Sequence, residues 1–404
     1  MRRDAAEVGV HSTAPDSRPT VHPVPGWLTL LGVLLLGLNL RAAIAALSPL
    51  LPDVQADLGL SRGMAGLLTT LPVLCFALLS SAAALLGRRV GIEVALLLAM
   101  LGVLAGSLLR TLPTAGWMLA GTAVIGAGIA VGNVMMPSIV KQDFPAHQGL
   151  VTGLSTSALT GGAAIAAAVS APLAHSAGLG WRGSLLVIGA FAGLTALVWL
   201  PQLRARRTTP PLRTGGASVL RNPVTWQLAV FMAMQSVTYY AVLAWLPALL
   251  VDRGISAARA GWALALFNLL GIATAVLVPV LAARRPDQRV LALLTSGAWA
   301  VGLVGLLAVP SLYLLWSLVA GLAQGAGIGL ALALIVLRAA SPESARDLSG
   351  AVQAIGYLLG STGPLIVGVL LDGSGGWNLP LLALCGATAV MALSSYGAAR
   401  NRPV

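Results

Sequence analysis

Charged side chains are scarce in this sequence. Of its 404 residues, 9% are Asp, Glu, Lys or Arg, whereas an ordinary soluble domain has about 25%. Hydrophobic residues make up 57%, and the mean hydropathy is +0.90. So few charges cannot cover the surface of a water-soluble globule. The composition therefore argues against soluble enzymes, nucleic-acid-binding proteins and disordered chains.

Carboxylates, histidine and cysteine are missing where they would carry chemistry. All twelve acidic residues and all four histidines fall in expected tails, loops or span ends. The two cysteines, Cys75 and Cys385, lie inside apolar segments, where they indicate neither a disulfide framework nor a metal site. Without Asp, Glu or His at membrane depth, the sequence offers no proton relay and no enzyme-like metal or nucleophile constellation. We therefore expect no enzymatic activity, no cofactor and no metal.

Long apolar runs are what the sequence has instead. A bilayer core about 30 Å thick is crossed by about 20 residues of helix. Twelve runs of about that length are bounded by charges or turn residues, which predicts an all-α membrane protein with 12 transmembrane helices. The expected spans are 27–51, 64–86, 92–112, 116–140, 149–174, 184–200, 225–251, 257–283, 290–309, 311–337, 348–371 and 377–396.

One polar stretch divides the spans six and six. Residues 202–222 contain five arginines together with Pro210 and Pro211, which is typical of an exposed linker. The sequence therefore predicts two six-helix bundles. The expected organisation is a cytoplasmic tail 1–25, a first bundle 26–201, a cytoplasmic linker 202–222, a second bundle 223–397 and a tail 398–404.

The net charge of +12 is explained by topology. If both termini are cytoplasmic, the inside segments hold 18 of the 24 basic residues, the outside loops hold five and one lies within a span. Residues 1–24 contain no apolar stretch, so they are expected to be a tail and not a signal peptide. The five outside residues are Arg62, Arg110, Arg182, Arg253 and Arg259.

The two halves share an internal repeat. The segment Asp57–Ser61 recurs as Asp252–Ser256 at an offset of 195, and Gly126–Ile129 recurs as Gly325–Ile328 at an offset of 199. These matches occur in the same order and at equivalent places in each half. They predict a parallel six-plus-six duplication around a pseudo-two-fold axis along the membrane normal, with a cavity between the halves.

Arg41 is the one charged residue expected in the middle of a span, since the others fall in tails, loops or span ends. It lies about 3 Å beyond the midpoint of span 27–51, at 1.5 Å per helical residue. A cation there costs roughly 2.5–3.5 kcal/mol on insertion scales, and no carboxylate in a span offsets it. One interpretation is that Arg41 snorkels or binds helix carbonyls. The other is that the substrate brings the counter-charge, since guanidinium suits carboxylates, cyanate-like anions and the oxygens of polar heterocycles.

Other polar residues in the spans are candidates to complete this site. At the 195 offset Ser236 is the repeat mate of Arg41, which places Gln235, Tyr239 and Tyr240 at a similar depth. Gln235 and Tyr239 share a helical face, and so do Gln353 and Tyr357. For each residue, hydrogen bonding between helices is an equally good interpretation. The expected substrate-binding residues are Arg41, Gln235, Tyr239, Tyr240, Asn133, Asn268, Gln324, Gln353 and Tyr357.

Paired basic loops follow the second and eighth spans. They contain Gly87-Arg88-Arg89-Val-Gly91 and Ala-Arg284-Arg285-Pro. Here the sequence resembles the major facilitator superfamily, whose signature loop has a glycine, an acidic residue and basic residues; the acidic residue is absent. The resemblance implies a gating role on the cytoplasmic side for Gly87, Arg88, Arg89, Gly91, Arg284 and Arg285. These arginines are equally explained as inside-facing charge.

Five further motifs are spread over both halves. They are Asn39-Leu-Arg41, Gly66 to Phe76, Gly132-Asn133 with Pro137, Lys141 to Pro145, and Gln235-Ser236 with Tyr240 and Trp245-Leu-Pro247. In these motifs the sequence is similar to the cyanate/nitroimidazole transporters within that superfamily. The resemblance covers most of residues 26–397 and implies a carrier in the bacterial inner membrane that moves a small polar or anionic solute by alternating access.

The leading hypothesis is thus a secondary active or facilitative transporter with Arg41 as the substrate anchor. Its partners would be the lipid bilayer and a small anionic or planar polar solute, and we expect it to function as a monomer without nucleic acid. One alternative is an exporter of neutral aromatic drugs, with a cavity lined by Met135, Met136, Met232 and Met234. A less favoured alternative is a passive anion channel.

Overall fold

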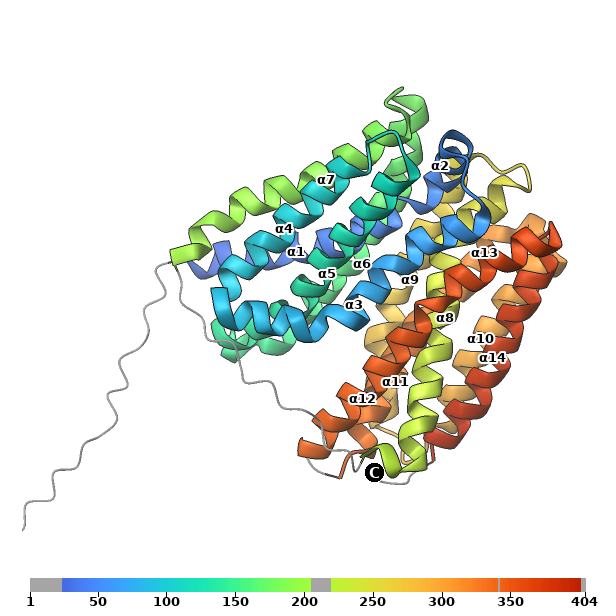
Figure 1. Cartoon of the computed structure of the whole chain (residues 1–404). Coiled ribbons are helices and arrows are strands. Elements are labelled where there is room, and N and C mark those ends of the chain that lie inside the picture. The colour runs from blue at the N-terminus through green and yellow to red at the C-terminus, as the bar shows by residue number, and fades with distance from the viewer. Residues whose placement is uncertain (1–23, 205–218, 341, 401–404) are drawn as a thin grey trace, which may run out of the picture.

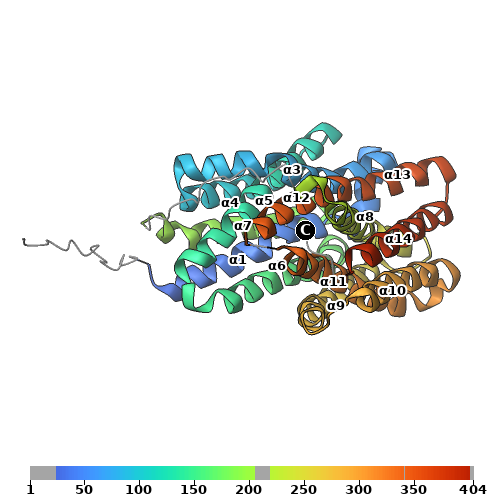
Figure 2. The same cartoon turned by 90° about the horizontal axis from the view of Figure 1, so that it is seen from below.

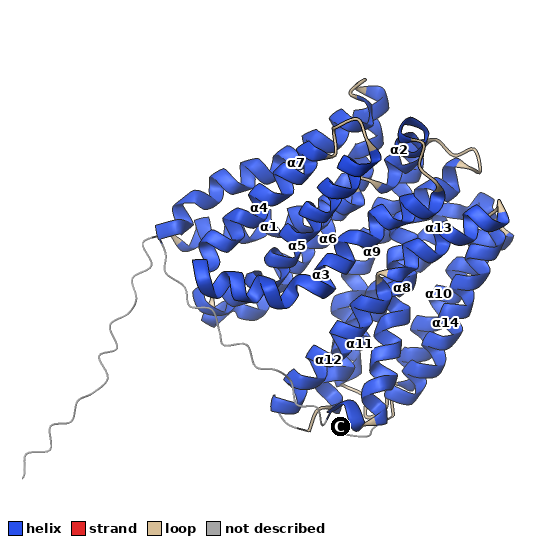
Figure 3. Ribbon diagram, in the orientation of Figure 1, coloured by secondary structure: helices blue, strands red, loops and turns tan. Residues whose placement is uncertain are grey.

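Helices account for all the regular structure in the part of the chain that the computed structural model describes, namely residues 24–204, 219–340 and 342–400 (Figure 1). Twelve helical segments are long and apolar enough to cross a membrane, which confirms the predicted spans and the all-α fold class. Short loops join most of them (Figure 3).

Each half contributes six of these spans. The first half contains α1 (Gly26–Ala45), a 3-10 turn (Ser48–Leu50), α2 (Leu51–Leu58), α3 (Arg62–Val90), α4 (Ile92–Leu109), α5 (Ala115–Asp143), α6 (Gln148–Ala171), a π-helical turn (Pro172–Ser176) and α7 (Gly180–Trp199). The second half contains α8 (Pro223–Val251), α9 (Ala257–Ala283), α10 (Arg289–Ala308), α11 (Tyr313–Arg338), α12 (Pro342–Gly360), α13 (Thr362–Ser374) and α14 (Asn378–Ala398).

Two spans that the sequence predicts as continuous are broken. The first stops being α-helical at Ala45 and continues through a 3-10 turn containing Pro49 into α2. The eleventh breaks at Ser361, so that α12 and α13 follow each other, with Pro364 in the first turn of α13. Proline has no N–H to donate to the preceding turn, which explains why a helix breaks just before it.

The ends of the predicted linker are folded into short helical turns. Gln202 is buried in a 3-10 turn, Leu200–Arg204, and its side chain is hydrogen-bonded to that of Thr29 at 3.1 Å. A second 3-10 turn, Val219–Arg221, leads into α8. Linker residues 205–218 and tail residues 1–23 and 401–404 lie outside the described residues, so the domain boundaries remain predictions.

The repeat reappears as matched backbone geometry. Gly59 and Gly254, which are 195 residues apart, both have left-handed φ angles, of 63° and 83°. These are conformations that side chains disfavour. Two residues later, Ser61 accepts a hydrogen bond from the Met64 N–H and Ser256 accepts one from the Arg259 N–H. Such capping satisfies a free donor at each helix start. The same local chemistry therefore starts α3 and α9.

The halves touch through matched glycines. A Cβ on Gly66 of α3 would lie 2.5 Å from the carbonyl oxygen of Pro364 in α13, and a Cβ on Gly261 of α9 would lie 2.5 Å from that of Ala167 in α6. The glycines are 195 residues apart and the carbonyls 197. Small residues allow helix backbones to approach this closely. These two contacts define what we call the closed end of the molecule.

A carboxylate also joins the halves at the closed end. Asp372, near the end of α13, accepts hydrogen bonds from the backbone N–H groups of Arg62 (3.0 Å) and Gly63 (2.7 Å). These donors are at the start of α3, where the helix dipole favours negative charge. From this end the two bundles diverge (Figures 1 and 2). We call their opposite ends, which include the α3–α4 junction, the open end.

We expect Gly66→Ala to destabilise the closed end. The added Cβ cannot fit beside the Pro364 carbonyl oxygen, and overpacking of this kind costs about 1–3 kcal/mol. The matched control is Gly153→Ala in α6, where an added Cβ meets no atom within 4 Å. Spin labels on cysteines at Ala56 and Ser374, in a background lacking both native cysteines, report the separation. Equal distance distributions in the two variants would contradict the role of Gly66.

Candidate functional site

Arg41 and Tyr239 meet between the two halves. Arg41 is partly buried on α1, and its Nη1 donates a hydrogen bond of 2.8 Å to the Tyr239 hydroxyl on α8. The guanidinium carbon also lies 5.2 Å from the centre of the Tyr239 ring. Tyr239 in turn donates to Oδ1 of Asn268 on α9, at 3.3 Å. A guanidinium has five N–H donors, and one of them is used within the described part of the chain.

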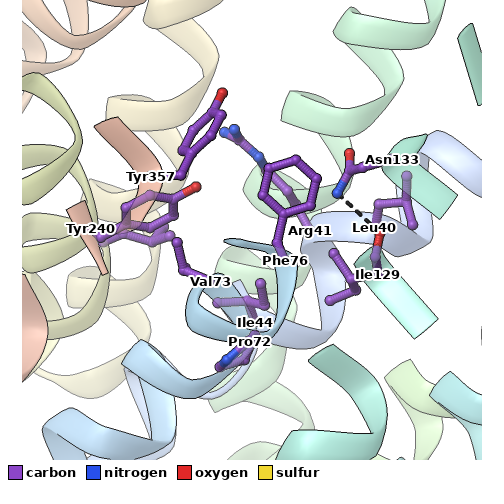
Figure 4. Close-up of a pocket in the computed structure, with 11 residues that line it drawn as sticks. Leu40, Arg41, Ile44, Pro72, Val73, Phe76, Ile129, Asn133, Tyr240 and Tyr357 are labelled. Carbon is purple, nitrogen blue, oxygen red and sulfur yellow. Dashed lines mark hydrogen bonds between the residues drawn. The ribbon is translucent and has the colours of Figure 1, made fainter. Parts of the chain in front are cut away.

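A small cavity lies on one side of Arg41 (Figure 4). We call it the inner cavity. It encloses about 70 Å³. In Figure 4, Arg41 extends toward Tyr357 and Tyr240, and Asn133 lies on the side away from these tyrosines. Asn133 Nδ2 donates to the Ile129 carbonyl oxygen at 3.1 Å. The lining residues are Leu40, Arg41, Ile44, Pro72, Val73, Phe76, Ile129, Asn133, Tyr240, Leu243 and Tyr357.

A second hollow, the side cavity, lies deeper in the second half. It is lined by Arg41, Gln235, Ser236, Tyr239, Tyr240, Gln324, Ile328 and Tyr357. Gln235 is held at both ends of its amide, since its Nε2 donates to the Gln324 carbonyl oxygen (2.9 Å) and its Oε1 accepts from Trp299 Nε1 (2.8 Å). The amide therefore has a fixed orientation beside the cavity.

The structure brings seven of the nine predicted residues to these cavities. Asn268 is fully buried and reaches the site only through Tyr239. Gln353 lines neither cavity, and its Nε2 donates to Ser349 Oγ on its own helix. The lining residues are Arg41, Gln235, Tyr239, Tyr240, Asn133, Gln324 and Tyr357.

The site carries positive charge without a built-in counter-charge. Among the described residues, no Asp, Glu or His lines either cavity, and neither does any cation besides Arg41. The phenols and amides that surround Arg41 are neutral hydrogen-bonding groups. They can orient the guanidinium or a ligand, but they cannot neutralise the charge.

Sequence and fold both match one family of membrane proteins. Residues 30–364 match the model of the Major Facilitator Superfamily. The chain belongs to this superfamily. A solved D-xylose-proton symporter has the same fold, with a TM-score of 0.73 at 16% identity. The match covers 93% of this chain and 98% of the symporter.

Two relatives confirm the resemblance to the cyanate/nitroimidazole transporters. The chain is 38% identical over 378 residues to the 2-nitroimidazole transporter of Escherichia coli, covering 92% of this chain and 95% of the relative. It is 33% identical over 355 residues to the cyanate transport protein CynX of the same species, covering 86% and 91%. The protein is therefore a transporter of the major facilitator type and not an enzyme.

Two side chains of this transporter's site were absent from the sequence-based candidates. Phe76 of α3 packs edge-on against Tyr357, with ring centres 5.3 Å apart. Trp299 of α10 is fully buried and orients Gln235. The signal for Trp299 is its position, because it lies in the middle of a span whereas interfacial tryptophans lie near span ends. No pattern in the sequence distinguishes Phe76 from ordinary core residues.

The basic loops differ from their predicted form. Gly87, Arg88 and Arg89 belong to α3, so that Gly91, with a φ angle of 88°, is the turn before α4. Arg284 follows α9 directly and caps its end. The structure gives no test of the gating role that the resemblance implies for Gly87, Arg88, Arg89, Gly91, Arg284 and Arg285.

The loop after α9 carries a close ion pair. Arg289 Nη2 lies 2.6 Å from Asp287 Oδ2. Hydrogen bonds from the Arg289 side chain and backbone hold the pKa of the Asp287 carboxyl below its usual value. The pair is exposed, so we expect it to shape the loop with little effect on overall stability.

The charge count predicted that Arg110 lies in an outside loop, but the structure buries its side chain. It is 2% exposed and packed between helices, where its Nε donates to Thr122 Oγ1 (3.0 Å) and its Nη1 to the Ala43 carbonyl oxygen (2.9 Å). That carbonyl is free because the break in the first span diverts its usual donor, the Leu47 N–H, to Ile44. Arg110 therefore satisfies the broken end of α1, two residues beyond Arg41.

We expect Thr122→Val to destabilise the protein. Valine keeps the shape of threonine but leaves the buried Arg110 Nε without an acceptor, and a hydrogen bond to a charged group is worth about 1.5–3 kcal/mol. The matched control is Thr295→Val, because the buried Thr295 hydroxyl bonds only to the Leu291 carbonyl of its own helix. Thermal unfolding of the two purified variants, followed by size-exclusion chromatography, makes the comparison. Equal melting temperatures would contradict the role assigned to Thr122.

Proposed function

We propose that this protein carries a small anionic or planar polar solute across the bacterial inner membrane, with Arg41 as the anchor for that solute. One observation carries the proposal. The Arg41 guanidinium lies between the halves, lines both cavities and forms a single hydrogen bond, while no acidic residue among those described lines either cavity. An anion bound there would supply the missing charge, and a planar heterocycle would supply acceptor oxygens.

The names of the two relatives support this class of solute. One is named for 2-nitroimidazole and the other for cyanate, which are a planar heterocycle and a small anion. Both solutes offer acceptors to a guanidinium and have flat or linear shapes. Tyr239, Tyr240 and Tyr357 surround Arg41 with aromatic faces and hydroxyl groups that suit such shapes.

The size of the site favours a small solute over a drug-sized one. A water molecule needs about 10–15 Å³ of cavity volume. The inner cavity, at about 70 Å³, therefore has room for only a handful of non-hydrogen atoms. None of the methionines considered for an aromatic-drug site lines either cavity beside Arg41. Met135 and Met232 are buried in the apolar core, Met234 packs against it, and Met136 lines a separate hollow between α5 and α6.

The arrangement of the halves supports alternating access as the mechanism. The duplicated contacts at Gly66 and Gly261 hold one end together while the bundles diverge toward the other. A passive channel would need both ends open at once, so the contacts at the closed end favour a carrier. By the positive-inside rule the open end faces the cytoplasm, with both termini on that side. Because one chain contains the whole site, we expect a functional monomer.

Uptake by Arg41 variants tests the anchor. Purified protein in liposomes is supplied with labelled cyanate, nitrite or 2-nitroimidazole. We expect Arg41→Ala to reduce the transport efficiency kcat/KM about thirtyfold or more, because loss of one partner from a buried charged contact costs about 2–5 kcal/mol, at tenfold per 1.4 kcal/mol.

Tyr239→Phe serves as the matched variant. It keeps the cation but removes the hydrogen bond that orients it, so we expect a smaller loss, about five- to tenfold, from roughly 1–1.5 kcal/mol. Size-exclusion profiles establish that both variants are folded. If Arg41→Ala takes up all three solutes at the wild-type rate, Arg41 is not the anchor. Flux that does not saturate with solute concentration would favour a channel.

A further inference from the structure

Lysine is almost absent from this sequence. Of the 24 basic residues, 23 are arginine, and Lys141 is the single lysine in 404 residues. It lies in the last turn of α5, a position where any cation interacts favourably with the helix dipole. That role would be served as well by arginine, which the chain uses everywhere else. The surroundings of Lys141 suggest why this position differs.

Lys141 lines a groove between α5 and α6, which we call the outer groove. It has a volume of about 370 Å³, several times that of the inner cavity. Thr152, Ser155 and Thr156 line the α6 side together with Leu159. The Ser155 and Thr156 hydroxyls donate to carbonyl oxygens of α6 and keep their oxygens as acceptors. Among the described residues, Lys141 is the only charged one in the lining. Asp143, two residues further along, does not line the groove.

The outer groove adjoins the proposed substrate site. Asn133 lines both the outer groove and the inner cavity. Lys141 is eight residues beyond Asn133 on the same helix, or about 12 Å at 1.5 Å per residue. A solute that moved from Arg41 toward the open end along this groove would pass the Asn133 amide and then the Lys141 ammonium group.

We propose that the outer groove is a second binding site for the transported solute, in which Lys141 holds a small monovalent anion on its way between Arg41 and the open end. This inference rests on the proposed function, since it takes the solute to be an anion. The choice of lysine fits a transient site. An ammonium is a compact, strongly hydrated point charge, whereas a guanidinium binds an anion through a rigid pair of donors and releases it less readily. A partly exposed charge also raises the local concentration of anions at the mouth of the path.

The single lysine allows a direct binding test. The full-length protein in phosphatidylcholine vesicles is treated with a water-soluble acylating ester, and peptide mass spectrometry measures acylation at Lys141, with the amino terminus as the internal reference. We expect nitrite to slow acylation of Lys141 about threefold relative to chloride at equal ionic strength, because a bound anion shields the amine. Acylation at the amino terminus should not change.

Repeating this labelling in Arg41→Ala separates the two proposals. Protection of Lys141 by nitrite should persist there, because the outer groove does not include Arg41. If Arg41→Ala transports normally while Lys141 is still protected, the anchor role fails and the second site stands. If nitrite gives no protection in either protein, the second site is overturned. Protection by phosphatidylglycerol but not by nitrite also overturns it, and assigns the groove to a lipid headgroup.

Transport kinetics give a second test that a merely structural role would not pass. Lys141→Gln should raise the KM for nitrite about fivefold, the scale of a partly exposed charge contact, and leave the KM for neutral 1-methyl-2-nitroimidazole unchanged. Lys141→Arg should restore most of the nitrite affinity. The control is Arg204→Gln, which removes an exposed cation in the same half without touching either cavity. An equal change for both solutes, or none for nitrite, overturns the proposal.

Discussion

A guanidinium held in an apolar bundle must find acceptors, and this requirement organises the centre of the molecule. Arg41 cannot lose its proton at any ordinary pH, so its environment has to accommodate the charge. The Tyr239 hydroxyl and ring provide one hydrogen bond and one aromatic face. Tyr239 is fixed by Asn268 and stacked on Phe267. The second half thus provides a rigid neutral wall facing a cation from the first half, and contact between the halves includes the site itself.

The duplication explains which features are shared and which differ. Both halves use a left-handed glycine, a serine cap and a glycine packed on a carbonyl oxygen, at offsets of 195 to 197. These devices concern how helices start and how the halves touch, so they are needed twice. Arg41, the proposed anchor, occurs once, because its repeat mate is Ser236. The tyrosines occur opposite it. In the function that we propose, movement depends on the symmetric features and solute binding on the asymmetric ones.

Sequence patterns predicted what depends on period and composition. The twelve spans, the duplication and the shared face of Gln235 and Tyr239 follow from apolar length, from offset and from helical spacing. What depends on packing could not be predicted in this way. Gln353 has the same spacing from Tyr357, yet it lies one helical turn away along α12, bonds to Ser349 and lines neither cavity. The break in the first span gives Arg110 an acceptor, and a charge count cannot tell such an inward side chain from an outward one.

The comparison of Arg110 with Arg41 sharpens what an unpaired cation means. Within the described part of the chain neither guanidinium is paired with a carboxylate, so the lack of a counter-charge does not by itself identify a ligand site. Arg110 bonds to the carbonyl left free by the break in α1 and to Thr122, and it lines none of the cavities around Arg41. Arg41 forms one hydrogen bond and lines both cavities. Arg110 is enclosed by protein, with two donors bonded and its Nη2 buried without a partner among the described residues, whereas Arg41 borders open space that a solute can enter. Position relative to a cavity, and not charge alone, separates the two roles.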